Sequence, residues 1–157
     1  MNLSEVKEAA TELLSEYVER LDSDRLEQWL DLFTEDASYT VIPRENVEQN
    51  LPAAIILCPS KNVLRDRIVA LRHANEYNLH YDRHVVSSIR VRPEADNLWS
   101  MEANYAVFQT TLEGRSKLFS VGRYRDKIRL ERNELLFSEK YIVVDTFSIP
   151  TLLATPL

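Results

Sequence analysis

Four long runs of strand-forming residues fill the second half of the chain, and they constrain its fold more than any other feature. The runs span residues 84–92, 98–111, 118–130 and 135–144, and turn-forming residues separate them. Strands that follow one another through short turns pair as antiparallel neighbours. The alternation of apolar and polar residues in the second run is imperfect, which indicates a sheet that is covered on both faces in places.

The first third of the chain has the periodicity of helices instead. Apolar residues recur at spacings of three and four from Val6 to Leu21, and Ser4 is a plausible N-cap. Residues 22–24 break this pattern, and a second helix is predicted to carry Leu26, Trp29, Leu30 and Phe33 on its apolar face.

The middle of the chain is less regular. Residues 34–38 are expected to form a loop, residues 39–42 a short strand and residues 44–50 an irregular segment. The apolar run 51–58 fits a strand or a buried helical turn, and a third helix begins after Ser60. Helices followed by a run of strands predict an α+β fold, a single domain over residues 1–157 in which a curved sheet wraps the helices as a cone.

Composition excludes several classes of function. The chain has 157 residues, a net charge of −6 and only 2 glycines, so it offers neither a glycine-rich phosphate loop nor the basic patch of a nucleic-acid binder. No run approaches the length of a membrane span, and the start of the chain lacks a signal-peptide pattern. With a single cysteine, these features predict a cytoplasmic protein without nucleic-acid or membrane partners.

Two groups of motifs carry a family resemblance. The first is Trp29-Leu30-Asp31-Leu32-Phe33-Thr34-Glu35-Asp36-Ala37-Ser38-Tyr39, which resembles the opening of NTF2-like, or ketosteroid-isomerase-like, cone folds. The second is an ordered series that resembles the small (beta) subunits of Rieske non-haem iron ring-hydroxylating oxygenases, closest to those acting on monocyclic aromatic acids such as salicylate. This series consists of residues 43–46, 49–52, 60–61, 65–67 and 81–87.

The resemblance implies a structural role in aromatic compound catabolism. A large (alpha) subunit would hold the Rieske [2Fe-2S] cluster and a mononuclear Fe(II), and three large and three small chains would form the complex. This chain would hold no cofactor. Its one cysteine, Cys58, cannot supply the two that a Rieske cluster needs, and a buried, inert thiol is expected there.

The three histidines are candidate iron ligands, because non-haem iron sites use two histidines and a carboxylate. His80 and His84 would share one face of a helix, but the surrounding residues read as a loop entering a strand, so no metal site is predicted. His73 is expected to end the third helix favourably.

Interface residues are predicted from the arginines in the middle of the chain, because planar guanidinium groups are enriched at interfaces. Ordinary solvated positions explain them equally well. The candidates are Arg44, Arg65, Arg67, Arg83 and the adjacent His84, with Arg72 in the same region. The apolar residues 149–157 are expected to dock on their own domain or on a neighbouring subunit.

Two alternatives remain open. Enzymes with the cone fold use buried acid–base groups, and a stand-alone isomerase or dehydratase would draw them from Asp31, Asp36, Tyr39, His84 and Asp145. Asp36 also suits a turn and Asp31 a solvated helix position. The second alternative is a binding module of the same fold.

Overall fold

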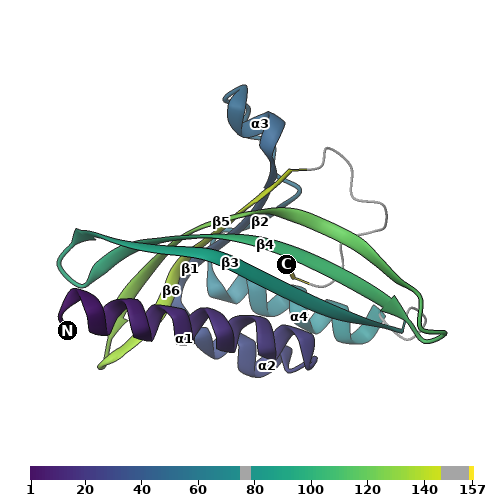
Figure 1. Cartoon of the computed structure of the whole chain (residues 1–157), viewed down its shortest axis with the longest axis horizontal. Helices are drawn as coiled ribbons and strands as arrows, with labels where there is room; N and C mark the ends of the chain where they lie inside the picture. Colours follow the sequence, from purple (N-terminus) through teal and green to yellow (C-terminus); the bar gives the residue numbers. More distant parts are fainter. Residues whose placement is uncertain (75–78, 146–155) are drawn as a thin grey trace.

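The computed structural model describes residues 1–74, 79–145 and 156–157, and shows helices lying along one side of a long curved sheet (Figure 1). The sheet has the strand order β2-β1-β6-β5-β4-β3. Its strands are β1 (Phe33–Pro43), β2 (Ile56–Cys58), β3 (His80–Ala95), β4 (Leu98–Thr111), β5 (Ser116–Glu131) and β6 (Glu134–Val144). The helices are α1 (Leu3–Asp22), α2 (Leu26–Trp29), the 3₁₀ turn η1 (Leu30–Leu32), α3 (Arg44–Glu48) and α4 (Lys61–Ala74).

Helix α1 follows its predicted apolar stripe but begins earlier than expected. Asn2, not Ser4, is the N-cap: its side chain accepts from the backbone N–H of Glu5, whose carboxylate accepts from the backbone N–H of Asn2. The helix buries one face, which includes Leu14 and Tyr17. It ends where Asp24 takes a left-handed conformation with φ of 56°.

Three predictions for the middle of the chain were wrong in detail. The second helix ends before Phe33, which already belongs to β1, and residues 34–38 continue that strand with an irregularity instead of forming a loop. Thr34 and Ala37 are buried within it, so tertiary packing overrides the polar composition. Residues 44–48 form the short helix α3, and β2 accounts for the end of the run 51–58.

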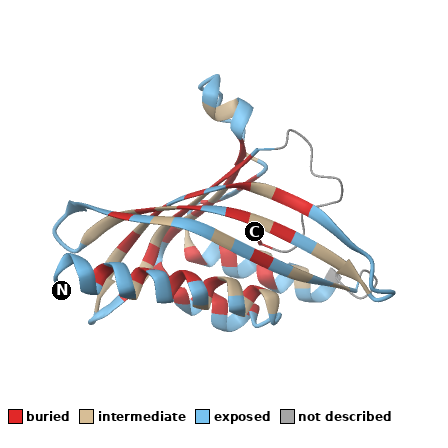
Figure 2. Ribbon diagram, in the orientation of Figure 1, coloured by how far each residue is buried: buried red, intermediate tan, exposed pale blue. Residues whose placement is uncertain are grey.

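The sheet is antiparallel from β3 to β6, as predicted, whereas β1 joins β6 in parallel. Strand β3 begins at His80, four residues before the predicted start. Helix α1 packs on β3 and α4 on β1, while α3 projects away from the helical layer (Figure 1). Buried residues lie where helices and sheet face each other (Figure 2), which confirms the α+β cone. Among the described residues, no helix combines the length and apolarity needed to cross a membrane.

Candidate functional site

Aromatic side chains from two helices and four strands line the inside of the cone. Tyr17 of α1 contacts four other rings, with centroid distances from 5.3 to 6.3 Å, and the rings of Tyr105 and Tyr124 stack at 4.7 Å. The buried rings of this lining are Tyr17, Trp29, Phe33, Tyr39, Tyr105, Tyr124 and Phe137. Side chains therefore fill this part of the cone.

A lysine and an aspartate form an ion pair within this aromatic interior. The Nζ atom of Lys140 on β6 lies 2.7 Å from Oδ2 of Asp126 on β5, and both side chains are 0% exposed. Strand pairing sets the two residues opposite each other, between the pairs Tyr124–Ile142 and Lys127–Glu139. The ammonium group also lies 3.4 Å from the ring centroid of Tyr124. A carboxylate and ring faces together replace the water that this cation has lost.

Burial perturbs both members of this pair. It raises the pKa of the Asp126 carboxyl to about 6 and lowers the pKa of the Lys140 ammonium to about 8, and in each case the partner opposes the shift. An amine with a lowered pKa is a stronger nucleophile near neutral pH. However, Nζ is enclosed here, so a substrate has no access to it in this structure, and the geometry fits a structural ion pair.

Leu157 docks inside the cone and is 1% exposed. Its N–H donates to the hydroxyl oxygen of Tyr39 at 3.0 Å, and the Tyr17 hydroxyl donates to its main-chain oxygen. Pro156 beside it is also buried. Burial is the main cause that raises the pKa of both tyrosines above the usual range, so their hydroxyls stay protonated. Leu157 therefore lies against its own domain, one of the two docking modes expected for residues 149–157, of which 149–155 lie outside the described residues.

A histidine and an aspartate form a second buried pair, between β3 and the last turn of α1. Nδ1 of His84 lies 2.6 Å from Oδ1 of Asp22, and Oδ2 of the same carboxylate accepts from the backbone N–H of His84 at 3.0 Å. This arrangement favours the tautomer with the proton on Nδ1. Nε2 is buried and has no hydrogen-bond partner among the described residues. The pair has the geometry of an oriented base, but the side chain of His84 is only 1% exposed.

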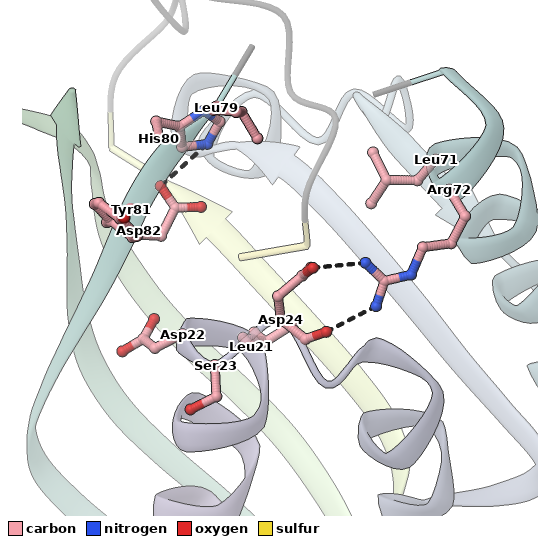
Figure 3. A pocket seen from close by; sticks show the side chains of 10 residues that line it. All are labelled: Leu21, Asp22, Ser23, Asp24, Leu71, Arg72, Leu79, His80, Tyr81 and Asp82. Atoms are coloured by element: carbon pink, nitrogen blue, oxygen red, sulfur yellow. Dashed lines mark hydrogen bonds and ion pairs between the residues drawn. The ribbon is translucent and has the colours of Figure 1, made fainter. Parts of the chain in front are cut away.

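A pocket of about 500 Å³ lies beside this pair, between the end of α1, the end of α4 and the start of β3 (Figure 3). Asp82 and His80 lie on its β3 side, with Oδ1 and Nε2 3.4 Å apart. Burial raises the pKa of the Asp82 carboxyl. On the other side, Arg72 pairs with Asp24 at 2.7 Å. The pocket lining therefore combines three aspartates with an arginine, a histidine and neutral side chains.

The structure separates the acid–base candidates from one another. Tyr39 and His84 are buried, whereas Asp31, Asp36 and Asp145 are exposed. Asp36 lies 2.7 Å from Arg129, which lowers its pKa. A shared site of the kind considered for a stand-alone enzyme is therefore not assembled from these five residues.

The predicted interface arginines lie at different places on the surface. Arg44 is exposed on α3 and pairs with Glu48 at 2.8 Å. Arg65 is exposed on α4, Arg67 is half-buried on the same helix, and Arg83 is exposed on β3. His84 faces the interior, so its side chain is not part of this surface.

The donor groups that the structure describes do not converge as an iron site would need. In the ranges 1–74, 79–145 and 156–157, no three histidine, cysteine or carboxylate side chains converge. His80 and His84 lie on β3, next to Asp82 and Asp22 respectively, while His73 is exposed on α4. Cys58 is buried in β2, and burial raises the pKa of its thiol, as expected for an inert cysteine.

Sequence reasoning missed Asp126, Lys140 and Asp22. A signal existed for the first two, because Asp126 alternates in phase with the buried Tyr124 and Ile128, and Lys140 with the buried Ile142 and Val144. A charged residue in the inward phase of a strand is rarely solvated. Asp22 gave no such signal, since it was read as a helix terminator.

Comparison with known proteins identifies close relatives along most of the chain. A family model described as "Ring hydroxylating beta subunit" matches residues 17–151. The anthranilate 1,2-dioxygenase small subunit of Burkholderia cepacia is 40% identical over 92% of this chain and 90% of its own length. A terephthalate 1,2-dioxygenase terminal oxygenase subunit, beta 2, of a Comamonas species is 33% identical over 90% of this chain and 92% of its own length.

Solved structures agree with this. The β subunit assigned to an aromatic-ring-hydroxylating dioxygenase of Novosphingobium aromaticivorans has a TM-score of 0.90 and 39% identity, covering 99% of this chain and all of that one. A structure described as a scytalone dehydratase from the same organism shares the fold, with a TM-score of 0.74 at 14% identity, covering 98% and 93% of the two chains.

Proposed function

The chain belongs to the ring hydroxylating beta subunit family, and we propose that it organises large oxygenase subunits that act on a monocyclic aromatic carboxylic acid. It is the small subunit of an aromatic-ring-hydroxylating dioxygenase, which has a large oxygenase subunit as its partner. The single observation that carries the substrate class is the 40% identity to an anthranilate dioxygenase small subunit. Terephthalate, named for the next relative, is also a one-ring aromatic acid. Salicylate stays within this class, because it carries a hydroxyl where anthranilate carries an amino group.

The small subunit holds no cofactor and no catalytic residue in this proposal. A Rieske cluster needs two cysteines and two histidines, and the chain has one cysteine. The buried groups that are chemically most distinctive, Lys140 and Asp126, are enclosed and paired with each other. The cluster and the mononuclear iron would both reside in the large subunit, in a cytoplasmic complex of three large and three small chains.

The outer face of the sheet offers a docking surface for the large subunit. Arg83 of β3 pairs with Phe108 of β4, which pairs with Leu118 of β5, and all three side chains are exposed. Tyr81 and Val85 extend this surface along β3 at 65% and 53% exposure. Apolar groups around an arginine are typical of the centre of an interface. Arg44, Arg65 and Arg67 are further contact candidates.

Co-expression with the large subunit tests the assembly and the substrate class. Native mass spectrometry should give three copies of each chain, with iron only in the large subunit. Oxygen uptake should be fastest with anthranilate, salicylate, terephthalate or benzoate and slow with unsubstituted hydrocarbons. Stoichiometric iron in the isolated small subunit, or preference for a hydrocarbon, would overturn the corresponding part of the proposal.

A charge reversal tests the docking surface. Arg83→Glu should reduce recovery of the large subunit in co-purification, because it places a carboxylate at the centre of the apolar patch. Arg132→Glu is the matched control, since Arg132 is exposed in the turn between β5 and β6, at the other end of these strands from the patch. Equal recovery with both variants would place the interface elsewhere.

The His84–Asp22 pair favours a second candidate, acid–base chemistry within the small subunit. Its supporting observation is the buried Nε2 atom without a described partner. His84→Gln in the assembled complex should then abolish turnover of the aromatic acid, while recovery of the large subunit in co-purification stays unchanged. Unchanged turnover would leave the pair a structural role only.

A further inference from the structure

The docked Leu157 occupies the interior of the cone in the way that a ligand occupies a binding site. Its side chain joins the hydrophobic core, and its two main-chain groups each have a specific partner, Tyr39 for the N–H and Tyr17 for the oxygen. Tyr39 lies on β1 and Tyr17 on α1, which are 118 and 140 residues away from Leu157 in the sequence. A single residue is therefore recognised by shape, by one acceptor and by one donor.

The cone also has hydrogen-bonding capacity that the docked residue does not use. Tyr124 is 0% exposed, and its hydroxyl has no hydrogen-bond partner among the described residues. Tyr124 lies in the same ring cluster as Tyr17, with centroids 5.9 Å apart. Buried polar groups without partners are uncommon in native proteins, and they mark places where a polar ligand atom or water would be stabilised.

We propose that the cone is a binding site for a small apolar molecule carrying an amide N–H and a carboxylate or carbonyl oxygen, and that Leu157 occupies this site in cis. The tyrosine hydroxyls supply polar recognition, and the aromatic wall supplies the apolar contact. Occupation by Leu157 closes the cone to free ligands. The chain thus keeps a built site inside a subunit whose role in the complex is structural.

The ligand class follows from the chemistry of the docked residue. N-acetyl-L-leucine reproduces the N–H, the oxygen and the branched side chain, whereas N-acetylglycine keeps only the polar groups. A protein lacking residues 156 and 157 should bind N-acetyl-L-leucine, detected by calorimetry or by ligand-observed NMR. N-acetylglycine should bind at least about tenfold more weakly, because burial of a leucine side chain contributes that much or more. The intact protein should bind neither.

Hydrogen bonding is tested separately in the shortened protein. Tyr17→Phe should weaken N-acetyl-L-leucine binding by at least about tenfold, because the ligand oxygen that replaces the Leu157 oxygen is a carboxylate and the lost hydrogen bond is to a charged group. Tyr141→Phe is the control, since Tyr141 lies on β6 outside the ring contacts of the cone. A folded, shortened protein that binds no N-acetyl-L-leucine would overturn the proposal, as would equal binding by the intact and shortened proteins.

A second variant covers failure of the shortened protein to fold. Leu157→Ala keeps both main-chain hydrogen bonds and removes only the buried side chain. It should lower Tm by about 5 °C. Leu112→Ala, at a position where the leucine is 58% exposed, should leave Tm within about 1 °C. Equal Tm values for the two variants would show that Leu157 is not held in the cone and would refute the proposal.

Discussion

Replacing Lys140 by Met isolates the energetic role of the ion pair inside the cone. Methionine keeps most of the length and volume of the lysine stem but removes the charge, so the carboxylate of Asp126 is left buried without its cation. Breaking one half of a buried pair costs about 3–5 kcal/mol, because the remaining charge stays desolvated. We expect the free energy of unfolding at pH 7.5 to fall by this amount.

The pH dependence of this penalty identifies its cause. In the native protein, burial raises the pKa of Asp126 to about 6 although Lys140 lowers it, so in the variant this pKa must rise further. A group with a raised pKa in the folded state contributes stability that is present below its unfolded pKa and is lost as pH rises toward the folded pKa. The variant should therefore lose about 1.36 kcal/mol for each pH unit across this window. The free energy of unfolding of the native protein stops falling above about pH 6, where Asp126 is already ionised. The penalty of Lys140→Met at pH 5.5 should therefore be about 2 kcal/mol smaller than at pH 7.5.

Urea denaturation of the native protein and the variant at the two pH values measures this difference. The double variant Asp126→Asn with Lys140→Met is the control, because it has no carboxyl group to titrate at this place. Its stability relative to the native protein should depend much less on pH. A penalty for Lys140→Met that is the same at both pH values would refute the reasoning, since an isolated buried carboxylate cannot be insensitive to protonation.

Three further substitutions test other parts of the structure. Asp22→Ala removes both acceptors from the buried histidine of β3 and should cost about 2–3 kcal/mol in urea denaturation, whereas Asp31→Ala, at an exposed position, should cost less than about 0.5 kcal/mol. Gly122→Ala should prevent stable folding or lower stability by about 3 kcal/mol, because a Cβ there would lie 2.0 Å from a carbonyl oxygen of β6. Gly114→Ala meets no atom within 4 Å and should cost only about 1 kcal/mol, from its φ of 85°. Arg129→Ala should change Tm by no more than about 2 °C and by less in high salt, because Arg129 and both of its carboxylate partners lie at the surface, with side chains 33%, 38% and 69% exposed for Arg129, Glu131 and Asp36; a larger change that persists in salt would contradict this.

The order of helices and strands could be predicted because its signals are local. The apolar stripe of α1 and the turns between the later strands are readable from the residues alone, and these elements lie within a few residues of their predicted ends. Residues 34–38 could not be read correctly, because their polar composition resembles a loop while pairing with β6 makes them a strand. Such pairing joins segments about a hundred residues apart, and composition carries no trace of it.

The buried pairs show the same limit. The inward phase of Asp126 could have been noticed from its own strand, but its partner depends on the register between β5 and β6, including the irregularity after Lys127. His84 was recognised as a candidate group from its sequence context. Its partner Asp22 lies 62 residues away, and only the folded structure brings the two together.

The parallel pairing of β1 with β6 also determines when the chain can complete its fold. The antiparallel strands β3 to β6 pair with their neighbours in sequence through short turns. Strand β1, in contrast, can pair only after β6 has formed, about a hundred residues later in the chain. Until β6 is in place, β1 has only the three-residue strand β2 as a hydrogen-bonded neighbour, so its other edge stays unpaired. Folding of this subunit is thus expected to be slow relative to its size, and an unpaired strand edge during synthesis makes early encounter with a chaperone or with the partner subunit an advantage.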